Sequence, residues 1–142
     1  MPLWKIYHPA NSFSDADKAA IAEQVTDLYG SIMPRFYVGV IFQTITPDNF
    51  YLGGKASDRF VRIVIEHIAR SFPEAKSGRR FIERVNALLI PYTGERGLDW
   101  ELHIDETPVD YWSINGHFPP PPGSDDDQRW RAENRPSPRT HD

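Results

Sequence analysis

FYVGVIFQTI, residues 36–45, is the stretch with the strongest β-strand signal in this sequence. Most of its side chains are β-branched or aromatic, and such residues favour strands. Residues 14–30 precede it and place apolar side chains at helical spacing, with Ser14 as the N-cap and Asp17 at the position that completes a capping box. A short apolar segment at residues 3–7 predicts another strand ahead of this helix. Together these segments predict one β-α-β unit.

A second strand–helix–strand pattern follows after a turn-rich joint. Residues 59–69 alternate polar and apolar side chains as a strand does, residues 77–92 have helical spacing, and residues 98–106 again have a strand pattern. We therefore predict an α/β fold, an α+β sandwich. In it, two consecutive β-α-β units (about 2–45 and 59–105) form a four-stranded sheet with two helices on one face.

The C-terminal part of the chain differs in composition from the rest. Residues 119–130 read PPPPGSDDDQRW, and four prolines followed by Gly, Ser and three Asp predict an extended or mobile segment. We divide the chain into a folded domain at residues 1–118 and a Pro-rich, acidic tail at residues 119–142. Trp130 is expected to dock this tail on the body or on a neighbouring subunit. A polyproline ligand for an SH3-like partner is the alternative.

The overall composition narrows the class of protein. A chain of 142 residues with 39% hydrophobic residues is expected to form one domain with a real core. Its net charge of -4 argues against a nucleic-acid partner, and the absence of cysteine excludes disulfides and thiolate chemistry. No segment has the length of a membrane span or the shape of a signal peptide. We therefore expect a cytoplasmic protein without a membrane partner.

The common motifs of cofactor, metal and nucleophile chemistry are missing from the sequence. The Gly-Gly pair at residues 53–54 does not have the spacing of a phosphate-binding loop. The histidines show no i,i+3 or i,i+4 pairing of the kind that holds a metal on a helix, and there is no G-x-S-x-G element. We therefore expect no cofactor and no metal.

Pro2 is the residue whose position suggests chemistry. Proline is tolerated as the first residue of a strand, which is a purely structural interpretation. If Met1 is removed, however, Pro2 has a free secondary amine, and an α-amino group has an ordinary pKa of about 8. Burial or a nearby guanidinium lowers that pKa further, and a neutral amine can move a proton in keto–enol tautomerisation. Both interpretations of Pro2 remain open at this point.

Several short motifs, taken in order, resemble the cis-3-chloroacrylic acid dehalogenase-like group of the tautomerase superfamily. They are the Pro after Met1, TDLY in the first helix, VIFQ in the second strand, NFYLGG in the joint, HIAR at the end of the third strand, ETP after the fourth, and NGHFPPPPG near the C-terminus. The resemblance covers most of the chain. It implies the fold predicted above, a homotrimer, and a site near each Pro2 that a neighbouring subunit partly walls.

The resemblance assigns roles to some residues, whereas at other positions this sequence has a different residue from the family. Pro2 matches the catalytic amine, and Arg70 matches an arginine that binds the substrate carboxylate by bidentate pairing. Tyr29 stands where the dehalogenases have a histidine late in the first helix, and Pro73 stands where they have a second arginine. His103 falls where they have a tyrosine in the fourth strand.

Asn115 marks a further departure, because it lies beside the position, Ile114, of the family's water-activating glutamate. An amide is no base at neutral pH, so hydrolytic dehalogenation or hydration of a 3-haloacrylate is disfavoured. That reaction would need another carboxylate near the site. The acidic residues that could stand in are Asp105, Glu106 and Asp110.

We therefore expect a cofactor-free tautomerase or isomerase that acts on a small keto or enol carboxylic acid. Pro2 would be the acid/base, Arg70 would bind the carboxylate, and Tyr29, His103 and Asn115 would bind substrate, with His103 coming from the adjacent chain. The alternative is a catalytically degraded family member that binds a small acid or a protein partner without turnover. A structural interpretation also stays open for each residue: a surface ion pair for Arg70, the core for Tyr29, a hydrogen-bonded structural histidine for His103, and a turn for Asn115.

Overall fold

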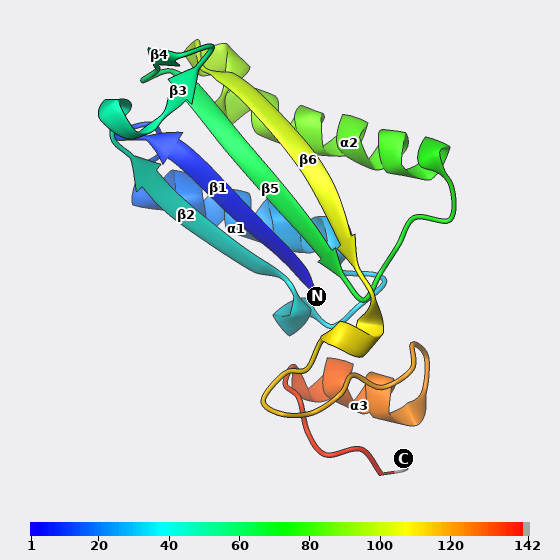
Figure 1. The fold of residues 1–142 in the computed structure, drawn as a ribbon. Coiled ribbons are helices and arrows are strands. Elements are labelled where there is room, and N and C mark those ends of the chain that lie inside the picture. Colours follow the sequence, from blue (N-terminus) through cyan, green and yellow to red (C-terminus); the bar gives the residue numbers. More distant parts are fainter. Residues whose placement is uncertain (141–142) are drawn as a thin grey trace.

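A computed structural model describes residues 1–140 of the chain. Its principal elements are β1 (Pro2–Pro9), α1 (Asp15–Tyr29), β2 (Gly39–Ile45), β5 (Phe60–Ile68), α2 (Ala75–Leu89) and β6 (Asp99–Thr107). The strand order is β2-β1-β5-β6, and α1 and α2 both cover one face of the sheet (Figure 1). β1 pairs in parallel with β2 and antiparallel with β5, which pairs in parallel with β6. The predicted fold of two β-α-β units with helices on one face is confirmed.

Helix α1 begins at the predicted capping box. The Ser14 side chain accepts a hydrogen bond from the Asp17 amide, and the Asp17 carboxylate accepts one from the Ser14 amide, so two of the free amides of the first turn are satisfied. Ile21, Val25 and Tyr29 recur every four residues and are buried on the sheet. The last of these side chains, at the end of the helix, reaches the site described below.

Strand β2 begins at Gly39, later than the sequence predicts. Residues Arg35–Tyr37 form a 3-10 turn, η1, ahead of the strand. Tyr37 is buried there, and its ring lies edge-on to the rings of Trp112 and Trp130, with centroids 4.9 Å and 6.3 Å away. Burial of a large aromatic side chain outweighs the modest β-propensity of the segment.

The second unit follows its sequence pattern closely. Strand β5 buries Val61, Ile63 and Ile65 beneath the helices and turns Arg62 and Glu66 to the opposite face. Fully burying a side chain of this size stabilises the fold by roughly 1.5–3 kcal/mol. Helix α2 packs on the same layer through Phe81, Val85 and Leu89.

Short elements lie between the two units, between α2 and β6, and after β6. Those between the units are η2 (Pro47–Asn49), β3 (Tyr51–Leu52) and β4 (Lys55–Ala56), those between α2 and β6 are η3 (Ile90–Tyr92) and η4 (Gly94–Arg96), and η5 (Val109–Tyr111) follows β6. Strands β3 and β4 pair as a hairpin whose turn residues, Gly53 and Gly54, have φ values of 55° and 80°. Positive φ at both central turn residues is a conformation that glycine adopts without steric cost.

The C-terminal segment is not the extended or mobile tail that its composition predicts. Asp125–Glu133 form helix α3, with Ser124 as the N-cap and three aspartates in the first turn, where the helix dipole favours negative charge. Trp130 is fully buried and donates from its indole nitrogen to the Ser137 carbonyl at 2.9 Å. Its ring also packs near that of Phe36, so this tryptophan docks the segment on the body as expected.

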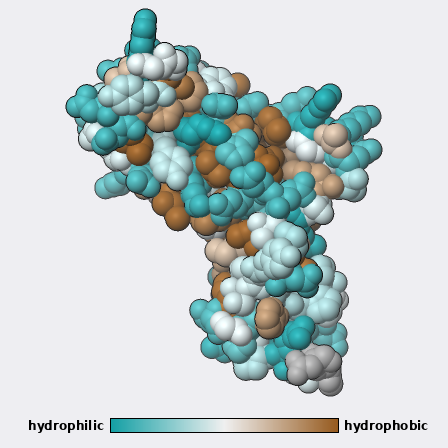
Figure 2. Space-filling model, in the orientation of Figure 1, coloured by the Kyte–Doolittle hydropathy of each residue, from teal (hydrophilic) through white to brown (hydrophobic). Residues whose placement is uncertain are grey.

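Within the described residues 1–140, the face of the sheet opposite α1 and α2 carries no helix (Figure 1). In Figure 2, which shows this face, hydrophobic surface lies between hydrophilic patches. Its side chains include Ile41, which is 48% exposed, and the ion pair between Lys5 and Glu66. Of the helices within residues 1–140, none has the length and apolar character needed to cross a membrane.

Candidate active site

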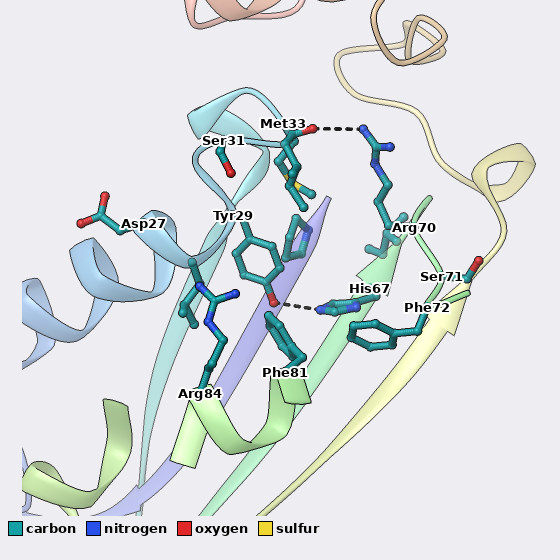
Figure 3. A pocket seen from close by; sticks show the side chains of 14 residues that line it. Asp27, Tyr29, Ser31, Met33, His67, Arg70, Ser71, Phe72, Phe81 and Arg84 are labelled. Carbon is teal, nitrogen blue, oxygen red and sulfur yellow. Dashed lines mark hydrogen bonds between the residues drawn. The ribbon is translucent and has the colours of Figure 1, made fainter. Parts of the chain in front are cut away.

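A cavity of about 430 Å³ opens where β1 begins and β5 ends (Figure 3). It lies between the C-terminal end of α1, the segment that follows α1, and the middle of α2. The side chains that give it chemical character come from β1, α1, α2, and the end of β5 with the residues after it. They are Pro2, Tyr29, His67, Arg70, Phe81 and Arg84.

The start of β1 provides an environment that disfavours a charged amine. Pro2 is fully buried and pairs with His67 in the register of β1 and β5. The Met1 amine donates to the Ile68 carbonyl at 2.5 Å, and burial, together with the charge of Arg70, lowers the pKa of this amine from 8.0 to about 5. An amine at this end of the strand is therefore largely neutral at pH 7.

A strained turn aims Arg70 at the cavity. Ala69 lies in the left-handed backbone region, with φ of 68°, and its amide donates to the Thr107 carbonyl at 2.8 Å. The chain thereby reverses directly after β5, and the half-buried Arg70 side chain extends to the Ile32 carbonyl, 3.3 Å from its Nη2. In Figure 3 its guanidinium lies above the ring of Tyr29 and the end of β5. It is placed to pair with an anion in the cavity.

A chain of hydrogen bonds crosses the floor of the cavity. The Trp4 indole nitrogen donates to the Tyr29 hydroxyl oxygen at 3.0 Å, and this hydroxyl lies 2.8 Å from His67 Nε2. All three side chains are at least nine-tenths buried. Burial raises the pKa of Tyr29, and burial followed by the charge of the N-terminal amine lowers the pKa of His67 from 6.5 to about 4. Both groups are neutral at physiological pH.

The structure brings Pro2, Tyr29 and Arg70 together at one cavity, but it does not bring His103 or Asn115 to it. His103 lies on the open face of the sheet, where its imidazole contacts the Arg62 guanidinium and its Nε2 lies 3.0 Å from the Asp105 carboxylate. Asn115 is exposed in a turn between Ile114 and His117, with φ of 50°. Both residues therefore lie outside the cavity of their own chain.

Carboxylates are scarce in the cavity. Asp27 is the acidic residue among its described lining, and its carboxylate is paired with Arg35 at 2.8 Å. Glu106 and Asp110 lie at a separate depression beside Arg70, and Asp105 lies on the open face. Within residues 1–140, no three His, Asp or Glu side chains are close enough to hold a metal ion.

His67 and Arg84 are cavity residues that sequence reasoning did not select. His67 is three residues before Arg70 in the same HIAR motif, and the alternation of β5 places it on the helix-covered face with Ile63 and Ile65. This alternation was the sequence signal that could have identified His67 as a residue on the helix-covered face. Arg84 projects from α2, and its position at the cavity follows only from how α2 packs against the sheet.

A sheet of two β-α-β units, with a buried proline at the start of the first strand and an arginine facing it, defines a tautomerase-like protein. The family described as putative oxalocrotonate tautomerase enzyme matches residues 1–135. The chain belongs to this family, within the tautomerase superfamily. No curated protein matches it in sequence.

Solved structures agree with this assignment. Native RhCC from Rhodococcus jostii RHA1 is 43% identical over 96% of this chain and 99% of that chain, with a TM-score of 0.92. A probable enzyme from the thermophilic fungus Aspergillus fumigatus is 37% identical over 97% of both chains, with a TM-score of 0.91.

More distant structures share the fold alone. N1, a member of the cis-3-chloroacrylic acid dehalogenase family, is 22% identical over 93% of this chain and 97% of that chain, with a TM-score of 0.74. A fused 4-OT described as an asymmetric trimer is 16% identical over 82% of this chain and 94% of that chain, with a TM-score of 0.66.

Proposed function

We propose that this protein is a cofactor-free tautomerase or isomerase of a small carboxylic acid that interconverts between keto and enol forms. The observation that carries the proposal is the buried, low-pKa amine environment at the start of β1, facing Arg70. After removal of Met1, the Pro2 nitrogen would be the terminal amine, and Pro2 is more deeply buried than Met1. We expect the same two causes, burial and the charge of Arg70, to lower the pKa of the Pro2 amine.

The proton transfer needs one base and a return path. The neutral Pro2 nitrogen takes a proton from the carbon next to the substrate carbonyl, or from the enol oxygen in the reverse direction. The resulting ammonium returns the proton at the other position, so that no net charge or atom is gained. Because Pro2 lies inside a cavity, the transferred proton is protected from exchange with bulk water.

Two guanidinium groups support an acidic substrate. Arg70 and Arg84 both line the cavity, on opposite sides of Tyr29 in Figure 3. Arg70 is the group proposed to bind the carboxylate, because a guanidinium fork matches the two oxygens of that anion. Arg84 has no ion-pair partner within the described residues, so it is available to a second acidic group or to the incoming substrate.

Hydrolytic dehalogenation is a weaker proposal for the same cavity. Activation of water needs a free carboxylate near the substrate, and the lining carboxylate, Asp27, is already paired with Arg35. Tautomerisation has no such requirement, which is why we propose it first.

We further propose that the protein is a homotrimer whose contacts involve the open face of the sheet. The fused 4-OT structure is described as a trimer, and the open face of this chain combines exposed Ile41 with half-buried apolar side chains of β1 and β5. His103 and Asn115 lie outside the cavity of their own chain. If they contact substrate, they do so at the cavity of a neighbouring chain.

The test of the function is selective modification of Pro2 followed by turnover of an enol. The purified protein is incubated with propiolate near neutral pH, and its mass is measured intact and after peptide mapping. We expect a chain that lacks Met1 and carries a single adduct, on Pro2. We expect the unmodified protein to ketonise the enol of a 2-oxo acid, and the adduct to abolish this activity. Arg70→Gln should raise KM, whereas Arg79→Gln, on the exposed side of α2, should not. A chain that retains Met1, or that stays unlabelled at Pro2, would leave a binding protein without turnover as the function.

A further inference from the structure

We propose that His67 is a neutral hydrogen-bond donor to the substrate oxygen, held in the Nδ1–H tautomer by Tyr29 and Trp4. This assignment rests on the proposed function, and it adds a catalytic residue and two positioning residues to the site. It is carried by the geometry of the hydrogen-bond chain beneath the cavity.

The direction of the chain follows from what each group can donate. An indole nitrogen only donates, so the Trp4 hydrogen points to the Tyr29 oxygen, 3.0 Å away. The one hydroxyl hydrogen of Tyr29 then has His67 Nε2, at 2.8 Å, as its acceptor. The opposite tautomer would direct two donors at the same hydroxyl oxygen and leave the buried Tyr29 hydrogen without an acceptor. Nε2 is therefore the unprotonated nitrogen, and the imidazole proton is on Nδ1.

The Nδ1–H group is available to a ligand. Within residues 1–140, Nδ1 of His67 has no hydrogen-bond partner. The side-chain polar atoms that are both unpaired and inaccessible to solvent are His8 Nε2 and the Tyr37 hydroxyl, so Nδ1 of His67 keeps some access to solvent. His67 is among the residues that line the cavity, and we infer that its Nδ1–H group faces this cavity. A donor that has no protein partner and faces a cavity is typical of a group that hydrogen-bonds to a ligand.

Aromatic packing holds the imidazole in place. The rings of Tyr29, Phe72 and Phe81 surround it, with centroids 5.6 Å, 5.1 Å and 5.2 Å from that of His67. In Figure 3 these rings and the Tyr29–His67 hydrogen bond form one layer beside the start of β1. A donor fixed in this way needs no reorganisation when charge develops on the substrate.

The surroundings keep His67 neutral. The titratable and charged groups that face it are the N-terminal amine, Arg70, the Tyr29 hydroxyl, Arg84 from α2, and Glu106, its register neighbour in β6. Burial and the positive amine both disfavour an imidazolium, in agreement with the geometry. As Pro2 removes a proton from carbon, the substrate carbonyl becomes an enolate, and the Nδ1–H group stabilises its negative oxygen without transferring its own proton.

The first test reads the tautomer directly, without substrate. In protein labelled with ¹⁵N-histidine, two-bond nitrogen–proton correlations distinguish a protonated Nδ1 from a protonated Nε2. We expect His67 to show only the Nδ1–H form between pH 6 and 8. In Tyr29→Phe protein we expect a mixture of tautomers, because Nε2 loses its donor. An Nε2–H tautomer, or an imidazolium, in the unmodified protein would overturn the assignment.

The second test separates this role from that of Pro2. His67→Asn keeps a donor near the Nδ1 position, whereas His67→Leu removes it. We expect the leucine variant to lose about 100-fold in kcat for enol ketonisation and the asparagine variant to lose about tenfold, with Pro2 still labelled by propiolate in both. Equal losses in the two folded variants, or no loss in either, would contradict the inference. Failure of labelling and turnover in the unmodified protein would instead remove the proposed function itself.

Discussion

Ala69 illustrates how a single backbone conformation positions a side chain. Its φ of 68° is costly for a residue with a Cβ, by roughly 1 kcal/mol, and it directs the following Arg70 back toward the cavity. The amide of Ala69 is held by the Thr107 carbonyl, so β6 maintains the turn. Strain next to the residue proposed to bind the carboxylate links local structure to function.

Replacing Ala69 with glycine should relieve this strain. We expect Ala69→Gly to raise the free energy of unfolding by roughly 0.5 kcal/mol, because glycine adopts positive φ freely while losing more entropy on folding. Urea denaturation measures the change. Ala87→Gly, at an exposed position within α2, is the control and should destabilise by about 1 kcal/mol. A loss of stability in both variants would show that Ala69 is not strained.

The buried histidines make stability depend on pH. His67 and His8 are 5% and 2% exposed, and burial is the main cause that lowers the pKa of each. In the unfolded chain both titrate near 6.5, so below that pH the unfolded state binds more protons than the folded state. Their contribution is complete above pH 6.5 and is lost as the pH falls toward about 4, the pKa of His67 in the folded protein.

We therefore expect the free energy of unfolding to fall by about 2 kcal/mol or more between pH 7 and pH 5. Denaturant titrations at these two pH values, with m-values compared, measure the difference. Combining His8→Phe with His67→Leu should flatten the profile in this range. If the double variant keeps the full pH dependence, other groups control it.

At the scale of elements, the segment between α1 and η1 forms one wall of the cavity and is held from two sides. The Ile32 carbonyl accepts from Arg70 at 3.3 Å and from Arg131 of α3 at 2.8 Å. Asn134, just after α3, accepts from the Phe36 amide at 3.1 Å. The C-terminal helix therefore supports a wall of the site, although it contributes no residue to the described lining of the cavity.

Loss of this tether should loosen the cavity wall. We expect Arg131→Met to speed amide hydrogen exchange at residues 31–36 several-fold and to raise KM for an enol acid, because the donor to Ile32 is removed. Arg135→Met is a matched control, since Arg135 is exposed and, within residues 1–140, its ion-pair partner is the nearby Glu133. Unchanged exchange at residues 31–36 in a folded Arg131→Met protein would show that α3 does not support the wall.

At the scale of the whole molecule, the two faces of the sheet differ in what covers them. The face under α1 and α2 holds the core, whereas the other face presents a mixture of apolar side chains and ion pairs such as Lys5–Glu66 (Figure 2). Val64 lies at the middle of this open face, between Lys5 and His103 in the strand register. A half-buried valine in that position suits contact with another chain.

We expect Val64→Glu to dissociate the proposed homotrimer, because it replaces an apolar side chain at the centre of the contact by a charged carboxylate, which is costly to bury. Sedimentation velocity measures the assembly, and circular dichroism shows whether the monomer keeps its fold. Ala87→Glu, on the exposed surface of α2, should leave the assembly intact. A trimer that persists in Val64→Glu protein would place the contact on another surface.

Some of these features could be predicted from local sequence. The Ser14–Asp17 capping box and the alternation of β5 depend on residues a few positions apart, and both are present as predicted. Helix α3 was missed because its sequence is strongly polar and one tryptophan, Trp130, provides most of its docking. The predicted strand start at residue 36 was wrong, because Tyr37 packs on residues distant in sequence and the strand begins only at Gly39.

The amino-acid sequence by itself determined the order along the chain of the four main strands and of the two helices on the sheet, the family, and Pro2 and Arg70 as candidate site residues, because periodicity and short motifs are local properties. Only the tertiary structure decided that His67 and Tyr29, 38 residues apart, share a hydrogen bond, and that His103 lies on the opposite face of the sheet. The physical reason is strand register. In a pleated sheet adjacent residues point to opposite faces, so the pairing of Pro2 with His67 determines which side chains meet at the cavity.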